Sequence, residues 1–237
     1  MNDKASSTDY AVSVAKGLIG AAPVVGPILA EIVGHVIPNQ RIDRLAKFVQ
    51  MLDDKFVELG KATLESRLQD PEIVDLLEDG FMAAARALTD EKRKHIASLF
   101  KNSILKTEIR ASQAKTLLQL LAELSDPEII LLQFYAKLAS SDRDEYRNKH
   151  KDIIQGPHAH LGSSTEERDQ VALHATMKTH LERLELIRPN YDSPFKGQIP
   201  EFDDKTGMLK AKSTDITWLG RLLLRIIDLD DGMKSKQ

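Results

Sequence analysis

Residues 70–104 read DPEIVDLLEDGFMAAARALTDEKRKHIASLFKNSI, and this stretch predicts the fold class. Asp70 can accept hydrogen bonds from first-turn amides, Pro71 suits the first helical position, and Glu72 favours the positive end of the helix dipole. Thr89 can cap a second helix. The apolar residues that we expect this second helix to bury are Ile96, Leu99, Phe100 and Ile104. Two helices in quick succession predict a mainly α fold.

The flanking sequence continues the helical pattern on both sides. From residue 41 to residue 68, apolar residues recur at spacings of three and four, as expected of one amphipathic helix. They are Ile42, Leu45, Val49, Leu52, Phe56 and Leu59. Residues 108–125 predict a further helix, with an inward face formed by Ile109, Ala114, Leu117, Leu121 and Leu124. We therefore expect a multi-helix bundle, and the 42–59 seam fits either packing within the chain or a homo-oligomer.

The motif Asp-Pro-Glu-Ile of residues 70–73 returns at residues 126–129. We interpret the recurrence as shared helix-start chemistry rather than as a duplication. The charged run that follows, SSDRDEYRNKHKD at residues 140–152, is typical of a solvated surface.

Composition restricts the functional classes. The 237 residues are 42% hydrophobic and 29% charged, with a formal net charge of −3, which suits a globular protein better than one that mainly neutralises phosphates. There is no cysteine, so a disulfide, a thiolate nucleophile and a Cys-ligated metal are excluded. The polar start MNDKASSTDY does not read as a secretory signal. We expect a cytoplasmic protein that is able to lie peripherally on the inner membrane.

Residues 11–38, AVSVAKGLIGAAPVVGPILAEIVGHVIP, contain only three ionisable residues, Lys16, Glu31 and His35. Glycine and proline recur every few positions, so the segment predicts a bent, apolar helical hairpin rather than one straight helix. Its longest uncharged piece, residues 17–30, is shorter than the roughly 20 residues that cross a bilayer.

This hairpin fits two environments, the interior of the fold and a membrane. The apolar side chains that would be buried in either one are Leu18, Ile19, Val24, Val25, Ile28, Leu29, Ile32 and Val33. The sequence leaves both environments open.

The C-terminal part predicts a separate α+β module. Ser164 and Glu167 have capping-box spacing and open a helix in which Leu173, Met177, Leu181 and Leu184 share one face. A short strand in ELIRPNY (185–191), a polar hairpin, a second strand before Ile216 and a final helix capped by Thr217 follow. This order is typical of a winged-helix-like module, with residues 141–153 as a preceding short helix.

The expected organisation has five parts. They are a disordered N-terminus (1–10), a helical domain (11–154) that includes the hairpin, a linker (155–164, QGPHAHLGSS), the winged-helix-like module (165–230) and a disordered tail (231–237).

Catalytic and metal-binding patterns are weak. The histidines His150, His158, His160, His174 and His180 lack the spacing of a metal site, and we expect them to face solvent. There is no nucleophile elbow, and the glycines of residues 17–26 lack the strand and lysine of a phosphate loop. We expect a protein that is not an enzyme, with no catalytic residue, cofactor or metal.

Four cations of the C-terminal module are candidates for nucleic-acid contact: Lys178, Arg183, Lys210 and Lys212. Carboxylates such as Glu182, Glu185 and Glu201 are interspersed with them, which favours a protein partner over DNA. Weak DNA binding stays open.

Several segments together resemble the bacterial abortive-infection alpha family of phage-defence proteins. They are APVVGPILAEIVGHVIPNQRIDRLAKF (22–48), IASLFKNSI (96–104), LAELSDPEIILLQFYA (121–136), LERLELIRP (181–189) and DITWLGRLLLRI (215–226). The resemblance implies a role in phage exclusion, in which the infected cell is arrested or killed, and it transfers no chemical activity. We therefore expect a phage-defence protein whose hairpin is released by a protein partner or a phage-derived trigger and then disturbs the inner membrane. The alternative is a soluble helical module that binds a protein or, weakly, DNA.

Overall fold

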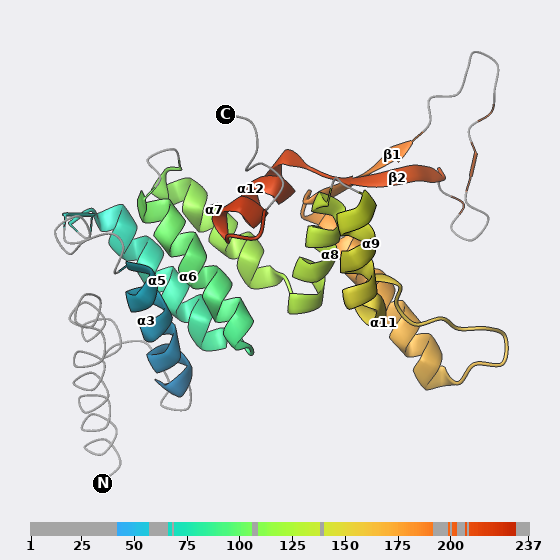
Figure 1. Cartoon of the computed structure of the whole chain (residues 1–237), viewed down its shortest axis with the longest axis horizontal. Coiled ribbons are helices and arrows are strands. Elements are labelled where there is room, and N and C mark those ends of the chain that lie inside the picture. The colour runs from blue at the N-terminus through green and yellow to red at the C-terminus, as the bar shows by residue number, and fades with distance from the viewer. Residues whose placement is uncertain are drawn as a thin grey trace, which may run out of the picture. The chain divides into compact units, whose positions relative to one another are not determined.

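A computed structural model describes residues 42–56, 66–67, 69–105, 109–137, 140–191, 199, 201–202, 207 and 209–230 (Figure 1). The described residues form helices and a single two-stranded sheet, which confirms the mainly α fold class. They fall into two compact units. The N-terminal unit contains the described residues up to Glu123 together with Ile226–Asp228, and the C-terminal unit contains Leu124–Arg225 and the residues from Leu229 onward.

The N-terminal unit consists of α3 (Ile42–Phe56), α5 (Pro71–Arg86), α6 (Asp90–Leu105) and α7 (Ala111–Glu123). Helix α3 packs against α5 and α6, and α7 packs against the same two helices. At the centre, the Phe48 ring lies 5.3 Å from that of Phe81 and 6.4 Å from that of Phe100, both edge-on. Predicted core residues that are buried here are Leu45, Val49, Leu52, Phe56, Ile96, Leu99, Phe100, Ile104, Ala114, Leu117 and Leu121. Ile109 is half-buried, and Leu59 lies outside the described residues.

Two helix starts of this unit follow from local sequence. The Asp70 carboxylate accepts a 3.0 Å hydrogen bond from the Glu72 amide. The Thr89 hydroxyl accepts one of 3.1 Å from the Lys92 amide. Both predicted N-caps are confirmed, because each cap needs only partners two or three residues away.

The C-terminal unit contains α8 (Asp126–Ala136), α9 (Ser140–Lys149), α10 (Lys151–Ile154), α11 (Thr165–Arg183), β1 (Ile187–Tyr191), β2 (Ala211–Ile216) and most of α12 (Trp218–Ile226). Helix α8 is its central element, since it contacts α9, α10, α11 and β2. The strands are antiparallel, with Ile187 opposite Ile216, and the register is irregular between Asn190 and Tyr191. Residues 155–164 contain neither helix nor strand.

Capping in this unit is mostly as predicted. Ser164 and Glu167 form a reciprocal capping box, and the Thr217 hydroxyl accepts a 3.0 Å hydrogen bond from the Gly220 amide. The second Asp-Pro-Glu-Ile motif begins differently from the first. Ser125 is its N-cap and forms a capping box with Glu128, so Asp126 is already inside α8.

The expected apolar face of α11 needs correction. Leu181 is fully buried and Met177 is half-buried, but Leu173 is 61% exposed. The packed face instead passes through Val171 and His174. Leu173 lies off this face because the inward positions of α11 follow a spacing of three in its middle turns.

The predicted hairpin of residues 11–38 and both predicted disordered ends lie outside the described residues. Among the helices that the structure describes, none combines the length and the apolar character needed to cross a bilayer.

Candidate functional site

The predicted nucleic-acid contacts lie on α11, on β2 and directly before β2, in the part of the C-terminal unit that ends with α12. Thr217 joins the start of α12 to the turn between α11 and β1. Its hydroxyl donates to the Glu185 carbonyl at 2.7 Å, and its amide donates to the Leu186 carbonyl at 3.0 Å. Gly220 is in the first turn of α12, and a Cβ there would meet the Leu186 carbonyl oxygen. Close backbone packing therefore sets the start of α12 against the turn between α11 and β1.

The predicted nucleic-acid contacts do not form one unneutralised patch. Lys178 lies 3.7 Å from the Glu182 carboxylate on α11, and Lys210 lies 3.2 Å from that of Glu201. Arg183 is exposed near the end of α11, five residues after Lys178, which places the two about 140° apart around the helix. Lys212 is exposed in β2 and has an interaction of its own.

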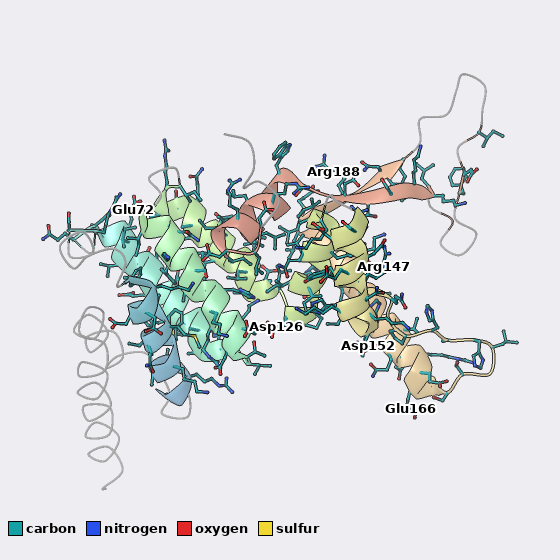
Figure 2. All side chains as sticks on the ribbon, in the orientation of Figure 1. Glu72, Asp126, Arg147, Asp152, Glu166 and Arg188 are labelled. Carbon is teal, nitrogen blue, oxygen red and sulfur yellow. The ribbon has the colours of Figure 1, made fainter. Side chains whose placement is uncertain are left out.

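Arg188 of β1 is also paired with a neighbouring carboxylate. The guanidinium of this residue, which is labelled in Figure 2, lies 3.2 Å from the exposed Glu185 carboxylate. A DNA-binding protein needs cations that are available to contact phosphate groups. Here, cations alternate with carboxylates, as the sequence indicates.

Large apolar side chains are exposed on the same elements. Trp218 is 79% exposed at the first position of α12, and Tyr191 is 50% exposed at the end of β1. Phe202 and Leu209 are also exposed and form an isolated β-bridge beyond the strands. Sequence periodicity does not reveal their exposure, because an apolar residue beside a strand or helix start is indistinguishable from a core residue until its neighbours are known.

A buried polar cluster joins α8 to α11. The Glu128 carboxylate accepts 2.7 Å hydrogen bonds from both the amide and the hydroxyl of Ser125, and its second oxygen lies 2.6 Å from Nδ1 of His180. The side chains of Glu128 and His180 are 8% and 20% exposed. The expectation that His180 faces solvent is therefore wrong. The Ser-x-x-Glu spacing could have revealed the capping half of the cluster, but not its histidine.

Hydrogen bonding controls the ionisation of Glu128. Burial alone would raise its pKa, but the hydrogen bonds from Ser125 and His180 outweigh burial and hold the pKa below its usual value. The Ser125 hydroxyl donates to Glu128, so this cluster does not place its serine proton on the histidine, as an activated serine nucleophile would require. The arrangement accounts for helix attachment rather than nucleophilic chemistry.

Most side chains of the charged run at residues 140–152 are exposed, as expected of a solvated surface, but one face of α9 is half-buried. Arg147, labelled in Figure 2, lies 5.2 Å from the Phe134 ring centre. The Tyr146 hydroxyl donates to the Gln133 side-chain carbonyl at 2.7 Å. Burial raises the pKa of Tyr146 to about 12. One face of α9 therefore packs against α8 through cation–π and hydrogen-bond contacts.

The other four histidines that were considered as metal ligands divide into two groups. His158 and His160 are exposed, as expected. The His150 ring packs 4.5 Å from that of Tyr146, and Nε2 of His174 lies 2.6 Å from the Ile153 carbonyl, so these two do not simply face solvent. Within the described ranges, no group of three or more His, Asp or Glu side chains is arranged to hold a metal.

The candidate membrane or packing residues cannot be placed in this geometry. Leu18, Ile19, Val24, Val25, Ile28, Leu29, Ile32 and Val33 all lie outside the described residues. Comparison with protein-family models, with curated proteins and with solved structures finds no match for this chain.

Proposed function

We propose that this chain is a non-enzymatic phage-defence protein that acts on the inner membrane through residues 11–38. The defence role rests on the resemblance to abortive-infection alpha proteins. The membrane role rests on one observation, the presence of only three ionisable residues in this Gly- and Pro-punctuated segment. Apolar burial is worth about 25 cal/mol per Å² in a fold and similarly favours a membrane, so a change in packing is enough to redistribute such a segment.

In this proposal, the segment stays packed in the resting cell and a protein partner or phage-derived trigger releases it. The trigger must bind the released state more tightly than the packed state, because only a difference in affinity shifts the balance between them. The released segment then disturbs the membrane of the infected cell.

The efficiency of phage plating tests this role in cells. Cells would express the full chain, a Val25→Asp/Ile28→Asp variant, or a Leu161→Asp control. The control adds a carboxylate at a side chain that is fully exposed in the C-terminal unit. We expect the natural chain and the control to reduce plating and the double variant to lose protection, because charges oppose membrane burial. Full protection by a stably expressed double variant would overturn the membrane role.

A second candidate function is protein binding by the C-terminal unit. We infer that α11, the two strands and α12 act as a winged-helix-like module that contacts a protein. The observation that favours this function is the exposure of Trp218 and Tyr191 in a unit whose cations Lys178 and Arg188 are ion-paired. Aromatic side chains are enriched at protein interfaces, whereas phosphate binding calls for available positive charge.

Fluorescence anisotropy with labelled duplex DNA separates these partners. The full chain should show no salt-sensitive DNA binding near physiological salt, and a Lys210→Gln/Lys212→Gln variant should behave identically. Lys94→Gln serves as the charge control, since Lys94 is exposed in the N-terminal unit and paired with Glu91. Binding that weakens steeply with salt and is lost only in the double variant would assign the module to nucleic acid instead.

A further inference from the structure

Helices α5, α6 and α7 of the N-terminal unit border an open pocket of about 390 Å³. This volume is within the range of small-molecule sites, roughly 300–1,000 Å³. Five apolar residues line it together with one arginine: Ala83, Ala87, Ile96, Leu118, Ala122 and Arg86.

The pocket exists because small side chains face it from two helices. Ala83 lies on α5, Ala87 is the C-cap residue that follows this helix, and Ala122 of α7 also lines the space. None of the three can fill the volume between α5 and α7. Ile96 and Leu118, both almost completely buried, supply apolar surface to the same pocket.

The charges around the pocket are not equivalent. The Asp79 carboxylate lies 3.0 Å from the Lys115 ammonium group, and Lys92 and Glu123 have interactions of their own. Arg86 is exposed, and within the part of the chain that the structure describes its guanidinium makes no ion pair or side-chain hydrogen bond. A cation in the last turn of α5 suits the helix dipole, but the dipole does not account for the alanine-lined hollow beside it.

We propose that this pocket binds a small monocarboxylate with an apolar tail. Arg86 would hold the carboxylate, because a guanidinium offers two parallel N–H donors to its two oxygens. The tail would lie against Ala83, Ile96 and Leu118, which gives the ligand one charged and one apolar end. The site is independent of the proposed membrane action.

Isothermal titration of the full-length protein with octanoate tests the proposal. The natural chain should bind octanoate, and Arg86→Gln should weaken binding about tenfold, as expected for loss of one charge-assisted interaction. Arg110→Gln is the matched control, because Arg110 is an exposed arginine of the same unit that does not line the pocket. It should bind octanoate like the natural chain.

Ala122→Leu provides a second, steric test. Ala122 is exposed, so a leucine there occupies pocket volume without entering the core, and we expect octanoate binding to be lost while thermal unfolding stays close to that of the natural chain. Two results would overturn the site: no octanoate binding by the natural chain at millimolar ligand, or equal binding by the natural chain and both pocket variants.

Discussion

Gly80 shows how a single residue permits the packing of the N-terminal unit. It lies in α5 directly against the Phe100 ring of α6, and a Cβ at this position would collide with Cε2 and Cζ of that ring. Phe100 is fully buried in the aromatic cluster with Phe48. The ring can therefore move only by disturbing a close-packed core.

Gly80→Ala should consequently lower the free energy of unfolding by about 1–3 kcal/mol, the usual cost of overpacking a core. Urea denaturation followed by circular dichroism measures the change. Gly162→Ala is the control, since a Cβ there would make only an ordinary 3.6 Å contact with His160. Equal stability of the two variants would contradict the packing described for α5 and α6.

The Glu128 carboxylate predicts a pH dependence with a definite sign. Its folded-state pKa is lower than the ordinary value of 4.5, so ionised Glu128 stabilises the fold. This contribution is present above pH 4.5 and is lost as the pH falls through the lower folded pKa. Glu128→Gln should destabilise the chain by about 1–3 kcal/mol at neutral pH, because it weakens a buried hydrogen-bonded cluster.

Chemical denaturation between pH 3 and pH 7 checks this prediction. The natural chain should lose more stability on acidification than Glu128→Gln does. Glu145→Gln removes an exposed carboxylate of α9 in the same unit and should retain the natural pH profile. If Glu128→Gln showed the natural profile as well, the carboxylate would not have the stabilising role assigned to it.

Helix boundaries could be predicted from sequence where the contacts that set them are local. The caps at Asp70, Thr89, Ser164 and Thr217 involve partners two or three residues away, and all four are present. The link between Glu128 and His180 spans 52 residues, and no local pattern reveals it. The pocket is equally inaccessible to sequence reasoning, because it depends on which faces of three helices meet.

A substitution at Thr217 tests the contacts that join the turn between α11 and β1 to the start of α12. The Thr217 hydroxyl both caps α12 and donates to the Glu185 carbonyl, so Thr217→Val should destabilise the chain by about 1–2 kcal/mol. Thr176→Val is a suitable comparison, because the Thr176 hydroxyl is exposed and donates only to Leu173 of its own helix. Differential scanning calorimetry should show a clearly larger loss for Thr217→Val, and equal losses would contradict the capping role.

For the molecule as a whole, sequence periodicity was sufficient to predict a mainly α fold with a short sheet near the C-terminus. It did not predict that residues 226–228 group with the N-terminal unit. Asn102 of α6 donates 2.8 Å hydrogen bonds to the Ile226 carbonyl and to the Asp228 carboxylate. Contacts between residues more than 120 positions apart depend on the tertiary fold. The winged-helix-like module and the apolar hairpin remain predictions.

The most direct test of the proposed function is inner-membrane potential, followed with a voltage-sensitive dye in cells infected by a phage that the chain excludes. Infection supplies the trigger, so the natural chain and the Leu161→Asp control should both depolarise the membrane before lysis. The Val25→Asp/Ile28→Asp variant, expressed to the same level, should leave the potential close to that of cells without the protein. An unchanged potential with the natural chain, or equal depolarisation by the double variant, would contradict membrane action through residues 11–38.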